Sequence, residues 1–374
     1  MKLTALIYLL LISSLATGQS IAQPAWKYEP GLLRPFWEGE VVEGETVLFI
    51  KEHADAPASA NLMYPISEVV SVKNSQGNMI FEEGRDYRFS ADSRTLTLTA
   101  DSRIPSFTPD ALRRPANTQK YALSHRDGQG EILFGGQLEY AAMQTSITYR
   151  HSPNPWKPIN SSFNSKHLPR YTELSRKKQP LTVVTLGDSI SEGANASGMF
   201  NAPPYQPAYP ELVRLGLSEQ TGSQVAMHNL SVGGKDTAWG VSQVDAVVAL
   251  KPDLVILAFG MNDAASRSVE DFQTKTKDMI HGIRKGLPNC EFILVASMLG
   301  NHDWTRLNHD AFPKYRDALK TLREPGIALA DLTEIWTRFL EMKKDCDQTG
   351  NGVNHPNDFG HRVYAQVILS ILKD

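Results

Sequence analysis

The second half of the chain alternates short apolar segments with longer amphipathic ones, and this alternation limits the folds that it can adopt. Strand candidates lie at residues 181–186, 224–229, 253–259, 291–297 and 327–330. Helix candidates lie near residues 208–221, 237–250, 269–286, 309–323, 332–344 and 357–372. Strands and helices that alternate at this spacing favour a parallel sheet covered by helices on both faces. We therefore predict an α/β domain over residues 181–374.

The first half of the chain has a different pattern, with short β-branched and aromatic segments between turn sequences such as 74–77 and 126–130. The strand candidates are residues 47–50, 69–72, 79–81, 87–89, 96–99, 131–134 and 146–149. Regular short strands separated by turns are typical of a β-sandwich or jelly roll. A chain of 374 residues also favours two domains. We predict an all-β sandwich domain, jelly-roll-like, over residues 23–151.

Two segments have the composition of a signal peptide and of an interdomain linker. Lys2 precedes an apolar run at residues 3–15, and small residues at 20–22 suit a signal peptidase, so we expect cleavage after Ala22. The run is too short and too interrupted for a membrane helix, and we expect a secreted or periplasmic mature protein outside the membrane. Residues 152–180 contain five prolines, which predict an extended linker.

Polar motifs follow three of the predicted strands. Gly187, Asp188 and Ser189 end the first, the sequence Asn-Leu-Ser-Val-Gly-Gly at 229–234 ends the second, and Gly-Met-Asn-Asp at 260–263 ends the third. The carboxyl ends of parallel strands meet at one edge of a sheet, where α/β folds bind their ligands. His355 lies in an Asn-His-Pro-Asn-Asp sequence before the last predicted helix.

These four motifs, in this order, resemble the SGNH (GDSL-type) hydrolase family over roughly residues 181–374. The resemblance implies a three-layer α/β/α flavodoxin-like domain, closest in kind to the secreted carbohydrate esterases of the family. It implies that Ser189 is the nucleophile and His355 its general base, because a serine hydroxyl attacks only when a base takes its proton. It also implies an oxyanion hole formed by the backbone N–H groups of Ser189 and Gly234 and by the Asn262 amide.

The third member of the expected triad is missing from its usual place. The family pattern has an aspartate three residues before the catalytic histidine, and this chain has Gly352 there. The polar residues nearby are Asp347, Asn351, Asn354 and Asp358. We expect either a Ser-His dyad, with a backbone carbonyl holding the ring, or a displaced acid. Asp358 is the candidate acid, although an acid in the first turn of a helix also has a sufficient structural role.

Trp304 is the candidate substrate-binding side chain, because it follows a predicted strand in a polar loop where an aromatic ring could stack on a sugar. Packing is the alternative role for this ring. His302, Asp303 and His309 have no standard zinc spacing. We therefore expect neither a metal nor a cofactor.

Composition excludes some partners and leaves others open. The net charge of −3 and the lack of a long basic cluster give no reason to expect nucleic acid. Cys290 and Cys346 are the two cysteines, and we expect free thiols because they fall at opposite ends of the predicted sheet.

The sequence thus predicts an exported serine esterase that removes O-acyl groups, foremost O-acetyl, from a polysaccharide or oligosaccharide. One alternative is a lipid or lysophospholipid esterase. The other is a non-catalytic carbohydrate-binding protein on a hydrolase scaffold.

Overall fold

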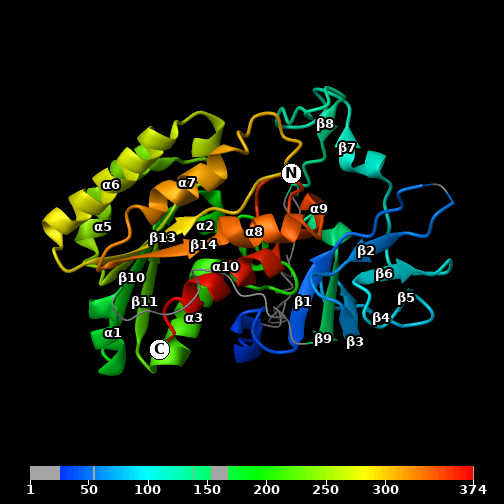
Figure 1. Ribbon diagram of the computed structural model, residues 1–374, viewed down its shortest axis with the longest axis horizontal. Helices are drawn as coiled ribbons and strands as arrows, with labels where there is room; N and C mark the ends of the chain where they lie inside the picture. Colours follow the sequence, from blue (N-terminus) through cyan, green and yellow to red (C-terminus); the bar gives the residue numbers. More distant parts are fainter. Residues whose placement is uncertain (1–25, 54, 137, 153–166, 374) are drawn as a thin grey trace, which may run out of the picture.

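The computed structural model describes residues 26–53, 55–136, 138–152 and 167–373. The expected leader at residues 1–22 lies outside the described residues, and so do residues 153–166 of the expected linker. Figure 1 shows an α/β domain and a β domain lying side by side along the longest axis of the molecule. No helix in the described ranges is both long and apolar enough to cross a bilayer.

The α/β domain is built on a parallel sheet of five strands in the order β11-β10-β12-β13-β14. The strands are β10 (Leu181–Gly187), β11 (Val225–Asn229), β12 (Leu254–Ala258), β13 (Glu291–Ala296) and β14 (Ile327–Asp331). All five segments predicted from the sequence are strands. Their order is that of flavodoxin-like sheets, in which ligands bind where the chain reverses direction, here between β10 and β12. The prediction of the fold class is confirmed.

Helices cover both faces of this sheet, as Figure 1 shows. On one face lie α3 (Tyr209–Thr221) and α10 (Asp358–Ser370), and on the other α4 (Thr237–Val241), α5 (Val244–Ala249), α6 (Val269–Gly286) and α7 (Ala311–Lys320). The helix predicted at 237–250 is interrupted at Ser242 and Gln243, where the Ser242 hydroxyl donates to the Trp239 carbonyl (2.6 Å). Ser268 caps α6 by accepting the Asp271 N–H, as expected of a serine before a helix.

The β domain consists of antiparallel strands in two main sheets. One sheet orders β1 (Val41–Val47), β9 (Thr145–His151), β3 (Ile66–Asn74) and β4 (Ile80–Phe81), and the other β2 (Ser59–Asn61), β6 (Thr95–Leu98) and β5 (Tyr87–Phe89). Buried side chains of both sheets, such as Ile147 and Leu96, share one core. A small pair, β7 (Arg113–Arg114) and β8 (Glu131–Ile132), lies apart in an arm over residues 113–135.

Part of the predicted linker is helical instead of extended. Residues Pro169–Arg176 form α1, with Pro169 in its first turn, where the missing N–H of proline costs no hydrogen bond. The Glu291 carboxylate accepts the N–H groups of Arg170 (2.9 Å) and Tyr171 (2.7 Å), which satisfies two first-turn donors. The expectation of an extended linker is therefore wrong for these eight residues.

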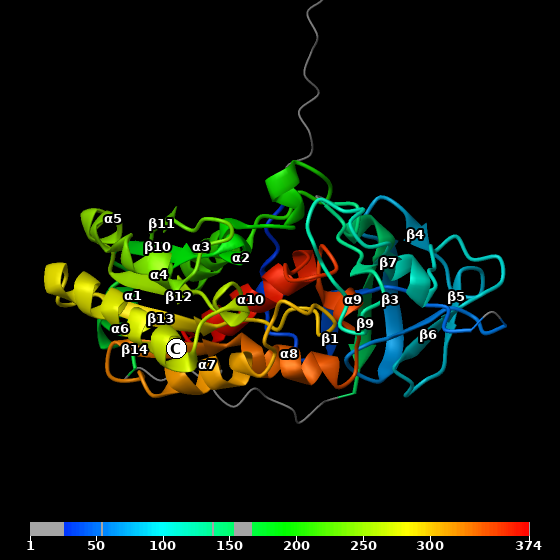
Figure 2. The same ribbon diagram turned by 90° about the horizontal axis from the view of Figure 1, so that it is seen from above.

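The two domains share a buried boundary. In both views β1 and β9 lie beside α9 (Asp345–Gln348) and the start of α10 (Figure 2). Lys343 is fully buried there against the Glu45 carboxylate and donates to the carbonyls of Thr46 (3.2 Å) and Asn61 (3.0 Å). Breaking such a pair leaves an uncompensated buried charge, at a cost of about 3–5 kcal/mol. The β domain is therefore packed firmly against the α/β domain and is not a loosely tethered module.

Candidate functional site

Ser189 stands at the carboxyl end of the central strand β10. Asp188 caps the short helix α2 (Ser189–Glu192) by accepting the Ile190 N–H (3.0 Å), which places Ser189 in the first turn. A Cβ at Gly187 would lie 2.4 Å from the Ala258 carbonyl oxygen, so only glycine fits where β10 passes β12. The Gly-Asp-Ser sequence therefore sets the direction in which the serine hydroxyl leaves the sheet.

The Ser189 hydroxyl pairs with His355. Its Oγ lies 2.9 Å from Nε2 of the ring, although the two residues are 166 positions apart in the sequence. Burial, with a smaller contribution from the nearby His361 ring, lowers the pKa of His355 to about 4. The ring is therefore neutral at neutral pH, and Nε2 can accept the serine proton.

The other ring nitrogen of His355 contacts amides, not an acid. Nδ1 lies 2.9 Å from Asn195 Oδ1 and 3.0 Å from Asn351 Nδ2. The Asp358 carboxylate instead accepts the Ser197 N–H (2.8 Å), and this corrects the expectation that Asp358 orients the histidine. Asp347 is occupied likewise, since its carboxylate accepts the N–H of Leu48 (2.8 Å).

Asn195 is a site residue that the sequence reasoning missed. It follows α2 in a left-handed conformation (φ 65°), which asparagine tolerates better than most residues. Its side chain reaches back to the ring of His355, where the expected dyad would have a backbone carbonyl. Asparagine in a turn after a helix is common, so nothing in the pattern distinguished it.

The predicted oxyanion donors surround the same edge. Gly234 adopts φ 74° in the loop after β11, and the Val232 N–H of this loop donates to the Gly187 carbonyl (3.2 Å) beside the serine. Asn262, in the loop that follows β12, donates one amide N–H to the Lys235 carbonyl (2.9 Å). This bond fixes the amide plane and leaves its second N–H for a ligand.

The acids beside these residues brace the loops. Asp263, fully buried, accepts both the N–H (3.1 Å) and the hydroxyl of Thr237, which ties the loop after β12 to the start of α4. Burial raises the pKa of Asp188 to about 7, and the field of Asp263 adds to this shift. Both carboxyl groups are thus engaged in local hydrogen bonds.

Two further side chains near the site, the candidate Trp304 and His361, pack partly or fully within the protein. Trp304 is half-buried against Leu123, Ile132 and Val353, so its ring joins the arm of the β domain to the loop of His355. Its role in substrate binding stays a prediction. His361 is fully buried, and its ring stacks on Tyr209. Among the described residues, no group of three metal-binding side chains comes together.

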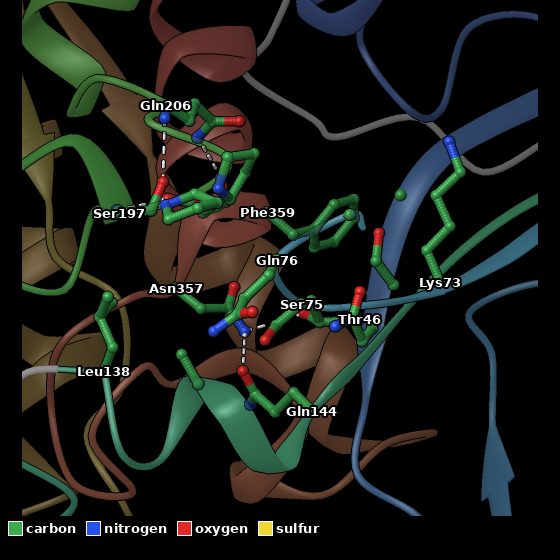
Figure 3. A pocket seen from close by; sticks show the side chains of 18 of the residues that line it. Thr46, Lys73, Ser75, Gln76, Leu138, Gln144, Ser197, Gln206, Asn357 and Phe359 are labelled. Carbon is green, nitrogen blue, oxygen red and sulfur yellow. Dashed lines mark hydrogen bonds between the residues drawn. The ribbon is translucent and has the colours of Figure 1, made fainter. Parts of the chain in front are cut away.

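A cavity of about 220 Å³ lies behind the site, at the boundary between the domains. Asn195 and Asp358 line it, together with residues of the β domain such as Thr46 and Gln144. Figure 3 shows the Asn357 amide between Thr46 and Gln144, to which it donates at 2.8 and 3.0 Å. Because Asn357 also caps α10, the β domain holds the residue two positions after His355.

Residues 185–363 match the model of the GDSL-like Lipase/Acylhydrolase family. No curated protein sequence gives a significant match to the chain.

Solved structures similar to this chain include hydrolases of low sequence identity. One is a two-domain esterase (CEX) active on acetylated mannans, with 18% identity, coverage of 57% of this chain and 54% of that chain, and a TM-score of 0.43. Another is the lipase Lip_vut3 from a goat rumen metagenome, with 15% identity, coverage of 51% and 97%, and a TM-score of 0.41. A third is a lipase/acylhydrolase from Enterococcus faecalis, with 20% identity, coverage of 50% and 93%, and a TM-score of 0.41. The match thus spans about half the length of the two-domain esterase.

Proposed function

We propose that this protein is a serine esterase of the GDSL-like lipase/acylhydrolase family, whose model matches residues 185–363, and that its reaction takes place at Ser189. The observation that carries the proposal is the 2.9 Å contact between Ser189 Oγ and His355 Nε2 at the carboxyl edge of the sheet. A nucleophile and base within hydrogen-bond reach are the first requirement of acyl transfer through a serine.

The reaction follows from these positions. Ser189 Oγ attacks the ester carbonyl while its proton passes to His355 Nε2, and the carbonyl oxygen becomes an oxyanion. The N–H groups of Ser189 and Gly234 and the Asn262 amide hold that oxyanion. His355 then returns the proton to the departing alcohol, which leaves an acyl-enzyme. Water, deprotonated by the same ring, releases the acid and regenerates Ser189.

The proposed substrate is a short O-acyl ester, foremost an O-acetyl group, on a polysaccharide or oligosaccharide. Its support is the polar character of the sheet edge near Ser189, where the exposed or half-buried side chains include Glu192, Lys235 and Asn262. A hydroxyl-rich leaving group finds hydrogen-bond partners on such a surface. The leader pattern at residues 1–22 supports export to a compartment where polysaccharides are met.

A second candidate, an esterase for longer acyl chains such as those of lipids, rests on two exposed apolar side chains. Met199 is 48% exposed and Val232 is 39% exposed. Met199 lies near Gly193, which ends the helix of Ser189, and Val232 belongs to the loop beside it. An acyl chain laid between them would be partly withdrawn from water.

The test is the rate of hydrolysis against acyl length on one leaving group. We expect kcat/KM to be highest for 4-nitrophenyl acetate and to fall for butyrate and octanoate, and we expect acetate release from an acetylated oligosaccharide. One methylene changes binding by only about 1–3 kcal/mol, so the trend decides and not a single substrate. A steady rise with chain length would favour the lipid substrate. No Ser189-dependent hydrolysis of any ester would favour a carbohydrate-binding protein.

A further inference from the structure

Two amide side chains approach the same nitrogen of His355 with opposite polarity. Asn195 presents its Oδ1, a hydrogen-bond acceptor, at 2.9 Å from Nδ1. Asn351 presents its Nδ2, a donor, at 3.0 Å. The Nδ1 atom of a neutral imidazole is either a donor or an acceptor, so only one of the two amides can bond to it at a time.

Backbone contacts fix both amides in these orientations. Asn195 Nδ2 donates to the Gly350 carbonyl (3.0 Å), which leaves its oxygen facing the ring. Asn351 Oδ1 accepts the N–H groups of Val353 (2.9 Å) and Asn354 (3.0 Å), which leaves its nitrogen facing the ring. Turning either amide over would set donor against donor or acceptor against acceptor in these contacts.

The choice between the amides is a choice of tautomer. Nε2 can take the Ser189 proton only when the ring proton is on Nδ1, and in that tautomer Nδ1–H donates to Asn195. In the other tautomer Nδ1 accepts from Asn351, and Nε2–H faces the serine and cannot act as a base. When the ring becomes an imidazolium during acyl transfer, Asn195 Oδ1 is again the acceptor that suits Nδ1–H, while the Asn351 N–H opposes it.

We propose that Asn195 is the positioning residue that holds His355 in the tautomer competent for catalysis, in the place that an acid has in a Ser-His-Asp triad. The assignment rests on the proposed function of Ser189 and His355. It also explains how the chain accommodates Gly352, where the family has its aspartate.

An amide orients the ring without supplying charge. The acids on the two helices that flank the ring bond elsewhere: Asp358 of α10 accepts the Ser197 N–H, and Asp188 before α2 accepts the Ile190 N–H. His361 of α10 lowers the pKa of His355 further, and no carboxylate among the described residues hydrogen-bonds to the ring. A triad acid would raise this pKa by holding the imidazolium.

The first test replaces Asn195 with residues that also tolerate its left-handed backbone. Asn195→Gly should keep the fold and lower kcat/KM by about 10²-fold or more, since the ring loses its orienting acceptor. Asn195→Asp should retain more activity than Asn195→Gly at neutral pH, because one carboxylate oxygen still accepts the Nδ1–H although the other opposes the Gly350 carbonyl. It should also move the acid limb of kcat/KM up by about one to three pH units, since a carboxylate favours the imidazolium. Asn201→Gly, at an exposed asparagine that also has a left-handed backbone (φ 51°), is the control and should change neither.

A residue with only a structural role would not produce this pattern. If Asn195→Asp leaves the acid limb in place, or Asn195→Gly retains wild-type kcat/KM, the assignment is wrong. Thermal unfolding of each variant shows that the comparison is made between folded proteins.

The second test reads the tautomer directly, without any substrate. Long-range ¹H–¹⁵N spectra of the full chain labelled at histidine should show the His355 proton on Nδ1 in the wild type. In Asn195→Gly the proton should shift toward Nε2, because Asn351 is then the remaining partner of Nδ1. The same tautomer in both proteins would refute the proposal. If the tautomer shifts as expected but no ester is hydrolysed in a Ser189-dependent way, the proposed function fails while the role of Asn195 stands.

Discussion

The site is assembled from two regions that are built in different ways. Ser189 and Asn262 follow adjacent strands of the sheet, and the backbone ladder between β10 and β12 fixes how far apart they lie. His355 lies in what we call the histidine loop, residues 349–357, which contains no strand. There the positions are set by side chains and isolated backbone contacts from distant parts of the chain.

The contacts of the histidine loop come mainly from outside the sheet. Gly135 N–H donates to the Asn351 carbonyl (3.1 Å), and Gln144 Nε2 donates to the Thr349 carbonyl (2.9 Å). On the opposite side, the Asn301 amide donates to the Gly352 carbonyl (2.8 Å). The β domain therefore contributes to the position of His355, while the position of Ser189 is set by contacts within the α/β domain. Substitutions in the two regions should therefore have different effects on kcat and on stability.

The largest effect is expected on the sheet side. Ser189→Ala should lower kcat for a small acetyl ester by at least about 10⁴-fold with unchanged thermal stability, because it removes the group that forms the acyl-enzyme. Ser191→Ala is a matched control in the same helix, since its hydroxyl bonds to Tyr209 (2.6 Å) and not to His355. Steady-state kinetics and thermal unfolding check both variants. Turnover near wild type in Ser189→Ala would remove the reaction from this site.

The next effect tests the second residue of the sheet side. Asn262→Ala should lower kcat by roughly 10²–10³-fold, the usual cost of one oxyanion donor. KM should move little, because the amide strengthens its bond to the substrate mainly in the transition state. Initial rates over a range of substrate concentration separate the two constants. A large rise in KM with kcat intact would make Asn262 a substrate-binding residue instead.

The same difference explains what the sequence could predict. Strand periodicity and the motifs after each strand predicted that Ser189, Gly234 and Asn262 lie at one edge of the sheet, because those positions follow from local pattern and from the parallel sheet. His355 was located through its motif before α10. The support for the ring was not predictable, since Asn195 meets His355 across 160 positions through one amide oxygen. Likewise, half-burial of Trp304 depends on the arm of the β domain, whose place no local pattern encodes.

A moderate effect is expected when the histidine loop loses its support. Gln144 is 1% exposed, and its Nε2 donates to the carbonyls of Cys346 (2.7 Å) and Thr349 (2.9 Å). Gln144→Ala leaves these buried acceptors unpaired, at about 1–3 kcal/mol each, and should reduce the free energy of unfolding. It should also lower kcat roughly tenfold, because small displacements of a catalytic base are costly.

Gln119 provides the matched control for Gln144. Its amide also bridges backbone groups, those of Ile132 (2.7 Å) and Phe134 (2.7 Å), but within the β domain alone. Gln119→Ala should therefore reduce stability and leave kcat unchanged. Urea unfolding and kcat measured on both variants check this. Equal losses of kcat in the two would mean that the histidine loop does not depend on the β domain through Gln144.

The smallest effect on catalysis is expected at Asp358, the acid that the sequence suggested for the triad. Its carboxylate accepts the Ser197 N–H and does not bond to the ring, so Asp358→Asn should keep kcat/KM within about threefold. Burial raises the pKa of Asp358 to about 6, above the value of about 4 expected in the unfolded chain. Ionising the wild-type group therefore lowers the free energy of unfolding as the pH rises from about 4 through 6. The asparagine does not ionise. The free energy of unfolding of the variant, measured in urea, should therefore rise relative to that of the wild type between pH 4 and 7. A collapse of kcat in the folded variant would instead indicate that Asp358 orients His355, and it would contradict the role assigned to Asn195.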